Sequence, residues 1–394
     1  MKNNKLQIVK LKDIVDVLNG YAFKSSKYVN SGYRVMRITN VQKGTLVDND
    51  PKYYEQSDDL DRYELKVGDI LISLTGNVGR VGLVEESILP AYLNQRVGCL
   101  RIKSDEVCNE YLFHWLNNDS FEDNCIRNSN GIAQLNMSSE WLKDVEIQLP
   151  SLDEQKKIAK ILDKADEIRA KKKLANNKLD EFLKSTFISM FGDSKGNPNG
   201  FELKELQTIS NVGSSKRVFV NELVEKGIPF YRGTEIGALA EGKEILPELF
   251  ITEEHYKELC DCTGKVNQGD LLLPSICPDG RIWQVQDNAE FYFKDGRVLW
   301  IRPNAGENST YIRYALKELF QSDYKHIASG TTFAELKIFI LKTLNIMYPP
   351  MELQNKFAQI VEHVEVQKQK NELVIEQMNN LFNSLSQRAF KGEL

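Results

Sequence analysis

A long helical pattern that occurs twice is the feature that most constrains the fold of this chain. Over residues 149–193, apolar residues recur in alternating steps of three and four, which predicts a helix that packs its seam against another helix. The pattern returns 199 residues later, at 349–394. A period of that length is too long for a solenoid repeat, so it indicates a duplicated unit of domain plus helix.

The two helices are expected to share a seam of matched positions. A polar residue, Lys172, interrupts the apolar row of the first helix, and Asn371 takes the equivalent place in the second. Such a residue weakens packing but can fix register and pairing orientation. The predicted seam residues are Ile158, Ile161, Ala165, Lys172, Leu179 and Phe182 in the first helix, and Phe357, Ile360, Val364, Asn371, Met378 and Leu381 in the second.

The ends of the first helix are also marked in the sequence. Ser151 followed by Glu154 predicts a capping box directly after Pro150, and Gly192 predicts a left-handed stop. At ~1.5 Å per residue, about 38 residues form a rod of roughly 57 Å. A rod of that length can hold two domains apart.

Composition is that of an ordinary soluble globular protein, with 27% charged and 41% hydrophobic residues among 394. No apolar run is long enough for a membrane span and no signal-peptide core is present, so we expect a cytoplasmic protein with reduced cysteines. The expected organisation is a first domain over 1–150, a long helix over 151–195, a second domain over 196–349 and a second long helix over 350–394. The expected fold class is α+β, with two similar mixed domains.

The two domains share a framework and differ in their loops. The segment VGDILIS from Val67 matches QGDLLLPS from Gln268, and QRVGCLR from Gln95 matches GRVLWIR from Gly296. In contrast, the loop SLTGNVGRVG of the first domain corresponds to PSICPDGRIW in the second. Two scaffolds that read different ligand surfaces of one kind would diverge in this way, and so would a duplication whose surfaces simply drifted.

The polar residues at the predicted strand ends suit nucleic acid. Arginine matches the edge of guanine, asparagine or glutamine that of adenine, and lysine or threonine commonly contacts phosphate. Any one of them can equally be solvated surface. The candidate DNA contacts are Lys24, Arg37, Thr39, Asn40, Thr75, Arg80, Gln95 and Arg96 in the first domain, and Lys216, Arg232, Thr234, Arg281 and Arg297 in the second.

Catalytic and metal motifs are missing from the sequence. There is no phosphate loop and no G-x-G-x-x-G opening a helix, and the four histidines are not spaced as metal ligands. We therefore expect no active site, no metal and no cofactor in this chain. The net charge is -5, so the chain does not show the basic footprint of a protein that binds nucleic acid unaided. Either nucleic acid is not the ligand, or another subunit contributes much of the positive charge.

The repeat, the GDILIS and QRV motifs and the Pro-x-x-x-x-Gln opening of each long helix together carry a resemblance. Pro150 with Gln155 and Pro349 with Gln354 form these openings. On these residues the chain resembles the specificity subunit of a type I restriction-modification system, over essentially its whole length. The resemblance implies two target-recognition domains and two long helices packed as an antiparallel coiled coil, related by a pseudo-twofold axis. Each domain would read one half of a bipartite site in double-stranded DNA.

The resemblance also implies partners that carry the chemistry. Two modification subunits, docked on the helices, would hold S-adenosylmethionine and methylate adenine at N6. Restriction subunits would use ATP and Mg for translocation and cleavage in phage defence. Two alternatives remain open: the recognition subunit of a related methylase-nuclease fusion system, and a two-domain scaffold that binds proteins.

Overall fold

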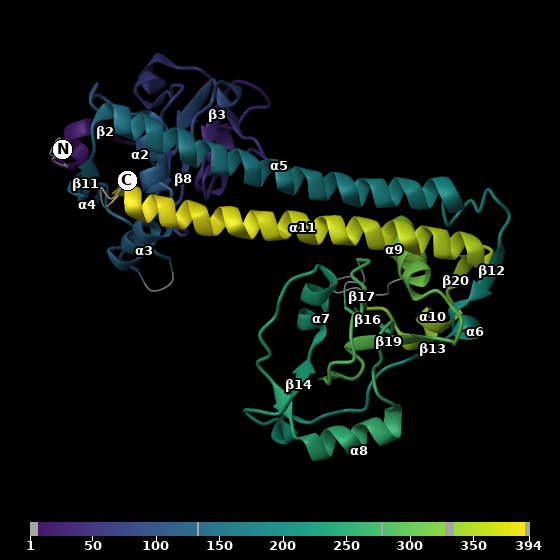
Figure 1. Cartoon of the computed structure of the whole chain (residues 1–394). Coiled ribbons are helices and arrows are strands. Elements are labelled where there is room, and N and C mark those ends of the chain that lie inside the picture. Colours follow the sequence, from purple (N-terminus) through teal and green to yellow (C-terminus); the bar gives the residue numbers. More distant parts are fainter. Residues whose placement is uncertain (1–6, 132–133, 277–278, 328–334, 391–394) are drawn as a thin grey trace. The chain divides into compact units, whose positions relative to one another are not determined.

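The chain folds into two compact units, each built from a domain and parts of both long helices. The structure, a computed structural model, describes residues 7–131, 134–276, 279–327 and 335–390. Unit 1 comprises Met1–Lys173 with Glu372–Leu394, and unit 2 comprises Leu174–Asn371. Each unit is described by itself below, and its elements can be followed in Figure 1.

Unit 1 contains a four-stranded sheet and a three-stranded sheet. The first has the order β2-β10-β7-β8 and the second the order β6-β3-β9. The strands are β1 (Gln7–Lys10), β2 (Val15–Asn19), β3 (Tyr33–Met36), β4 (Val41–Gln42), β5 (Thr45–Leu46), β6 (Tyr53–Tyr54), β7 (Ile70–Ser73), β8 (Val81–Leu83), β9 (Ala91–Leu93), β10 (Val97–Ile102) and β11 (Glu146–Leu149). The helices of the domain are α1 (Leu11–Ile14), α2 (Asn109–Leu116), α3 (Asp119–Arg127) and α4 (Ser139–Lys143), with 3-10 turns η1 (Ser25–Lys27), η2 (Ile38–Asn40), η3 (Asp58–Tyr63) and η4 (Glu86–Ile88).

Unit 2 repeats this topology. Its sheets have the orders β13-β19-β16-β17 and β15-β14-β18. The strands are β12 (Glu202–Glu205), β13 (Ser210–Gly213), β14 (Ile228–Tyr231), β15 (Phe250–Ile251), β16 (Leu271–Pro274), β17 (Trp283–Gln284), β18 (Tyr292–Phe293), β19 (Val298–Pro303) and β20 (Asn345–Tyr348). The helices are α6 (Leu206–Ile209), α7 (Gly233–Ala240), α8 (Glu253–Thr263), α9 (Ser309–Ile327) and α10 (Ile338–Thr343), with η5 (Val220–Glu222). The mixed α+β fold agrees with the sequence prediction.

The long helices are α5 (Leu152–Phe191) and α11 (Met351–Phe390), and parts of each lie in both units. In unit 2, Asn371 Nδ2 donates to Asn176 Oδ1 at 2.7 Å and Lys368 Nζ donates to Asp180 Oδ1 at 2.8 Å. In unit 1, Arg169 Nη1 donates to Asn379 Oδ1 at 3.0 Å. Residue numbers rise along one helix as they fall along the other, so the helices run antiparallel within unit 2.

The start of α5 confirms the predicted cap and explains the Pro-x-x-x-x-Gln motif. Ser151 N donates to Glu154 Oε2 at 3.2 Å, and Glu154 N donates to Ser151 Oγ at 3.4 Å, as in a capping box. The buried Gln155 donates from Nε2 to the Pro150 carbonyl at 3.0 Å and accepts from Cys108 N at 2.9 Å. Gln354 makes the same bond to its proline carbonyl at 2.9 Å. The glutamine therefore fixes each long helix to the strand before it.

The predicted seam is wrong at three positions. Ile161, Phe182 and Leu381 are 48%, 49% and 44% exposed, whereas the residues that follow them are buried. These buried residues are Leu162, Leu183 and Phe382, and they share the core with Ile158, Ala165, Phe357, Val364 and Asn371. The buried stripe is rotated because each helix packs against its own domain as well as against the other helix. A stripe of 3.6-residue period also drifts from a strict heptad over this length.

Among the residues that the structure describes, no helix is long and apolar enough to cross a membrane.

Candidate nucleic-acid interface

Three loops meet at one end of the domain in unit 1, and we call this meeting point the loop junction. Strand β7 ends at Ser73, opposite Val97 at the start of the antiparallel β10. Just beyond, Leu74 N donates to the Arg96 carbonyl at 3.1 Å. The third loop is joined by a bridge between Thr75 and Asn136. Residues far apart in the sequence are thus held together by backbone pairing.

Unit 2 has the same loop junction with different side chains. Ser275 N donates to the Arg297 carbonyl at 3.0 Å, and Leu336 N donates to the Ser275 carbonyl at 2.8 Å. Ile276 bridges Glu335, as Thr75 bridges Asn136 in unit 1. The framework of the junction is therefore duplicated, while Asn136 in one copy corresponds to Glu335 in the other.

The turn after β2 brings further candidates to the junction of unit 1. Tyr21 N donates to the Leu93 carbonyl at 2.9 Å, and Gln95 N donates to the Tyr21 carbonyl at 3.0 Å. A Cβ on Gly20 would lie 2.3 Å from the Asn94 backbone, so only glycine permits this approach. Gln95 and Arg96 are exposed beside the turn, as is Lys24 a few residues on. The structure thus brings these three candidates to one end of the domain.

Asn40 is a wrong prediction. It is buried, its Oδ1 accepts from Arg37 N at 2.8 Å, and its Nδ2 donates to the Val47 carbonyl at 2.7 Å. These bonds close the η2 turn, so the amide is used inside the protein. Its neighbour Thr39 is exposed and Thr75 is half-buried.

The candidate arginines of unit 1 are mostly held by acidic or amide groups. Arg37 Nη2 lies 3.5 Å from Asp50 Oδ2. Arg80 Nε lies 3.6 Å from Glu122 Oε1, and its Nη1 donates to Gln42 Oε1 at 3.2 Å. Arg96 differs, since it has no ion pair within the described parts of the chain.

In unit 2, all three candidate arginines pair with carboxylates. Arg232 Nη2 contacts Glu235 Oε1 at 2.5 Å and Glu248 Oε2 at 3.1 Å. Partial burial disfavours the charge of Glu235, but hydrogen bonds from Arg232 outweigh it and lower the pKa of this carboxyl to about 2. The other pairs are Arg281 with Asp279 at 2.9 Å and with Glu241 at 3.6 Å, and Arg297 with Glu335 at 3.7 Å.

The remaining candidate DNA contacts of unit 2 are Thr234 and Lys216. Thr234 is exposed and donates from Oγ1 to Glu235 Oε2 at 3.0 Å. Lys216 is exposed, and its Nζ lies 3.7 Å from Cys262 Sγ. A Cβ on Gly233 would lie 3.3 Å from the Arg297 carbonyl, so the start of α7 adjoins the loop junction.

Sequence reasoning missed the acidic and amide partners of the arginines. Gln42 and Glu335 are distant in sequence from Arg80 and Arg297, the arginines that they contact. No local motif marks them. The offset of 199 residues that relates Asn136 to Glu335 was the one available signal.

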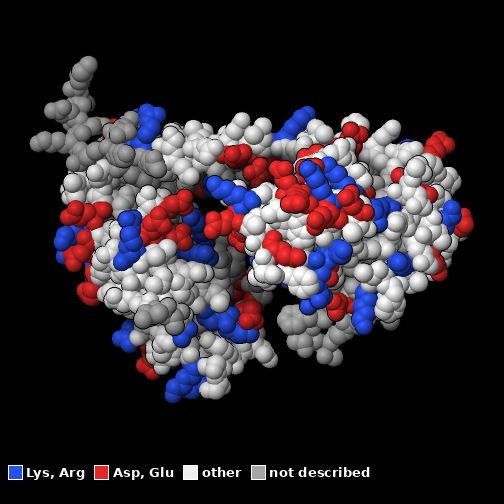
Figure 2. Space-filling model, turned by 90° about the horizontal axis from the view of Figure 1, so that it is seen from below, with Lys and Arg blue, Asp and Glu red and all other residues white. Residues whose placement is uncertain are grey.

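Charge is mixed on one face of the molecule. Figure 2 shows Lys and Arg interspersed with Asp and Glu on the face in view, without a continuous basic area. Among the described residues there is also no cluster of three His, Cys, Asp or Glu side chains that could hold a metal ion. These arginines are therefore set among acids instead of forming a basic groove.

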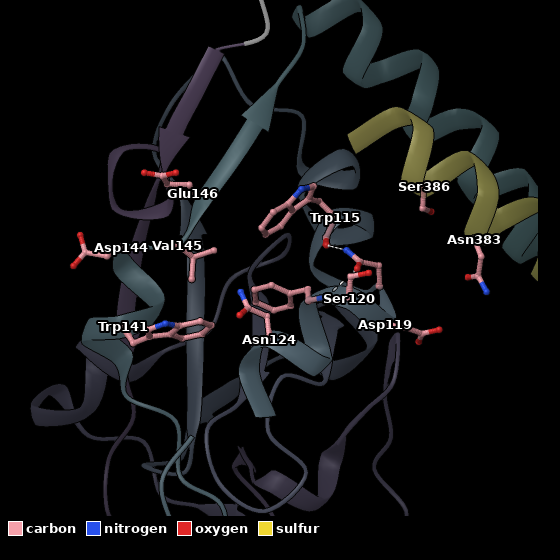
Figure 3. Close-up of a pocket in the computed structure, with 12 residues that line it drawn as sticks. Trp115, Asp119, Ser120, Asn124, Trp141, Asp144, Val145, Glu146, Asn383 and Ser386 are labelled. Atoms are coloured by element: carbon pink, nitrogen blue, oxygen red, sulfur yellow. Dashed lines mark hydrogen bonds between the residues drawn. The ribbon is translucent and has the colours of Figure 1, made fainter. Parts of the chain in front are cut away.

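A hollow of about 570 Å³ lies elsewhere in unit 1, between the domain and the end of α11. Figure 3 shows Trp115, Trp141 and Ser120 around it, with Asn383 and Ser386 contributed by α11. None of the candidate DNA contacts lines this hollow. The candidate interface is thus the set of loops around the junctions, and not this hollow.

Comparison with known proteins identifies the family. The family model described as the type I restriction modification DNA specificity domain matches residues 3–180 and 198–377. The chain belongs to this family. Each match spans one domain and part of the long helix that follows, so the family unit corresponds to the repeat seen in the fold.

Several relatives carry related names. The chain is 23% identical to the type I restriction enzyme EcoBI specificity subunit of Escherichia coli, over 98% of this chain and 85% of that protein. It is 32% identical to the MjaVIII specificity subunit of Methanocaldococcus jannaschii over 177 residues, which are 42% of this chain and 41% of the relative. The latter match thus spans less than half of that protein.

Solved structures of this family share the fold. The S subunit of a type I restriction-modification system from M. genitalium superposes with a TM-score of 0.58 at 17% identity, covering 99% of this chain and 97% of that chain. The prediction of family and fold class is therefore confirmed.

Proposed function

We propose that this chain is the DNA-recognition subunit of a type I restriction-modification complex. Its two target-recognition domains, over 1–150 and 196–349, each read one half of a bipartite site in double-stranded DNA. The helical segments 151–195 and 350–394 fix the unread gap and dock two modification subunits in the cytoplasm. The chain reads sequence, while adenine methylation and ATP-dependent cleavage belong to the partner subunits.

The observation that carries this proposal is the duplicated loop junction. Both copies hold an arginine directly before a central strand, Arg96 before β10 and Arg297 before β19. In both copies the arginine carbonyl accepts from the residue after the neighbouring strand, Leu74 or Ser275, whereas the bridged residues Asn136 and Glu335 differ. One framework with two sets of side chains is what two different half-sites require.

The paired arginines also bear on the partners. Phosphate neutralisation supplies most non-specific affinity for DNA, and this chain has a net charge of -5. Arg232, Arg281 and Arg297 pair with carboxylates, so these three arginines are less available to the phosphate backbone. We therefore assign most phosphate contacts to the modification subunits.

A matched pair of substitutions tests the proposal. Arg96→Ala and Arg297→Ala, each in the complex with modification subunits, are expected to relax one base position in different halves of the methylated motif. Each costs about 1 to 3 kcal/mol of discrimination, since a bidentate arginine contact is lost. Lys103→Ala is the control, because Lys103 directly follows β10 at its other end and pairs with Asp16.

Methylation mapping of the host genome gives the readout. A bipartite motif that disappears with the gene supports a specificity subunit. A motif that persists, or one whose two halves both change in either variant, would contradict the assignment of one half-site to each domain. A modification partner fused to a nuclease would favour the related fusion system.

A further inference from the structure

The ion pair between Arg297 and Glu335 lies exposed at the loop junction of unit 2. Arg297 Nη1 is 3.7 Å from Glu335 Oε1, and the side chains are 54% and 42% exposed. An exposed pair of this kind adds little to stability. The two residues are instead brought together by backbone, through the bridge from Ile276 to Glu335 and the bond from Ser275 to the Arg297 carbonyl. The pair is therefore not needed to build the junction.

Unit 1 provides an internal comparison. Its junction has the same backbone bonds, but Asn136 stands where unit 2 has Glu335. Arg96, the counterpart of Arg297, is exposed and has no ion pair within the described residues. The backbone pairing of the junction forms with an amide in one unit and a carboxylate in the other, so it does not itself require a carboxylate at this place.

A carboxylate beside an exposed arginine changes what that arginine can bind. A DNA phosphate that approaches Arg297 also approaches the negative charge of Glu335, and like charges repel. A guanine edge carries no net charge, so it suffers less from this repulsion while still accepting two hydrogen bonds from the guanidinium. The pair therefore favours base contact over phosphate contact.

A hollow adjoins the Glu335 side of the pair, although Arg297 itself does not line it. Glu335 lines a hollow of about 450 Å³ together with Gly296, Lys337 and Phe339. Phe339 is 64% exposed, so an apolar surface lies beside the ion pair. The hollow thus presents two lysines, Lys337 and Lys342, and an apolar ring beside the carboxylate of Glu335.

We propose that Glu335 determines specificity in the second domain by acting through Arg297. The carboxylate is a positioning group: it orients the guanidinium toward a base edge and discourages its use as a general phosphate contact. This inference rests on the proposed function, because it assumes that the second domain reads DNA.

Glu335→Gln in the complex with modification subunits tests the proposal, since the change keeps shape and removes charge. Base preference is measured by methylation of a library randomised over the bipartite site, and non-specific affinity by titration of unrelated duplex DNA at several salt concentrations. We expect preference at one base position of the second half-site to fall about tenfold, and non-specific affinity to rise with a steeper salt dependence. Glu335→Asp, which keeps the negative charge, should retain most of the base preference.

Two further variants separate positioning from direct contact. In an Arg297→Ala background, Glu335→Gln should have no additional effect on base preference, because its action passes through the arginine. Asn136→Glu should give the first domain the property of the second and lower non-specific affinity. Melting temperatures of all variants verify that the loops remain folded.

Two results would refute the role proposed for Glu335. Unchanged base preference and unchanged non-specific affinity in Glu335→Gln, in a complex that Arg297→Ala does relax, would refute it. So would an effect of Glu335→Gln that persists without Arg297. If instead the unaltered complex methylates no bipartite motif, the proposed function fails and not this inference alone.

Discussion

Adjacent residues near the end of α11 offer a sharp test of how the long helices pack. Phe382 is 4% exposed, whereas Leu381 is 44% exposed. The Phe382 ring lies 5.7 Å from the His114 ring of α2, and the Arg169 guanidinium of α5 lies 4.8 Å from its centroid. This side chain therefore joins the domain of unit 1 to both long helices.

Truncation of the two residues is expected to have very different effects. Phe382→Ala removes a buried ring and leaves a cavity, which costs about 3 to 5 kcal/mol of unfolding free energy. Leu381→Ala removes a half-solvated side chain, and a surface change of this kind costs below about 1 kcal/mol. In unit 2 the equivalent pair is Leu183 and Phe182, 2% and 49% exposed, so Leu183→Ala should be the damaging change there.

Urea unfolding of the purified chain measures these costs. Hydrogen exchange with mass spectrometry locates them, because Phe382→Ala should lower protection in unit 1 and Leu183→Ala in unit 2. A heptad seam read from sequence would instead make Leu381 and Phe182 the costly positions. Equal or greater destabilisation by Leu381→Ala would refute the packing described here.

Two further predictions concern Glu235 and the length of the rods. Glu235→Gln should lower stability at neutral pH, because bonds from Arg232 depress the pKa of Glu235 in the folded state. The stability difference from the unaltered chain should vanish as pH falls from about 4.5 to about 2. Thermal melts over this range measure the difference, and one that persists below pH 2 would contradict the assignment. Insertion of one heptad into each long helix beside Lys172 and Asn371 should lengthen each rod by about 10 Å and widen the unread gap by about three base pairs. Methylation mapping checks this, and an active complex with an unchanged gap would argue against the helices as the spacer.

The repeat was predictable from sequence because it depends on local signals. Pro150 with Gln155, and Pro349 with Gln354, mark the helix starts by spacing alone, and the structure gives both glutamines the same bond to a proline carbonyl. The seam was predicted less well. Periodicity cannot show that a helix packs against a domain on one side and another helix on the other, and this double contact is what places Leu162 inside and Ile161 outside.

The side chains that lie beside the two loop junctions were beyond sequence reasoning for a different reason. Asn136 and Glu335 reach their junctions through bridges to Thr75 and Ile276, so their neighbours are set by tertiary pairing. Asn40 failed as a candidate for a local reason, because its side-chain amide accepts from Arg37 N and donates to the Val47 carbonyl, both close in sequence. Residue type indicated which contacts a side chain could make with DNA. Only the fold determines whether its polar atoms are already bonded to other residues of the protein.

An acidic chain with paired arginines is consistent with a protein that must reject most DNA. Each carboxylate beside an arginine lowers affinity for any phosphate, at non-specific and specific sites alike, while contacts to an uncharged base edge lose less. Low affinity of each domain for its half-site is offset when the two domains are linked. Once the first domain is bound, the effective concentration of the second domain at the second half-site is raised. The gain depends on a linker of defined span, and under the proposed function this linker is the pair of 40-residue helices, which are stiffer than a flexible chain. Under this scheme, modest affinity in each domain is what makes recognition depend on both half-sites at the correct separation.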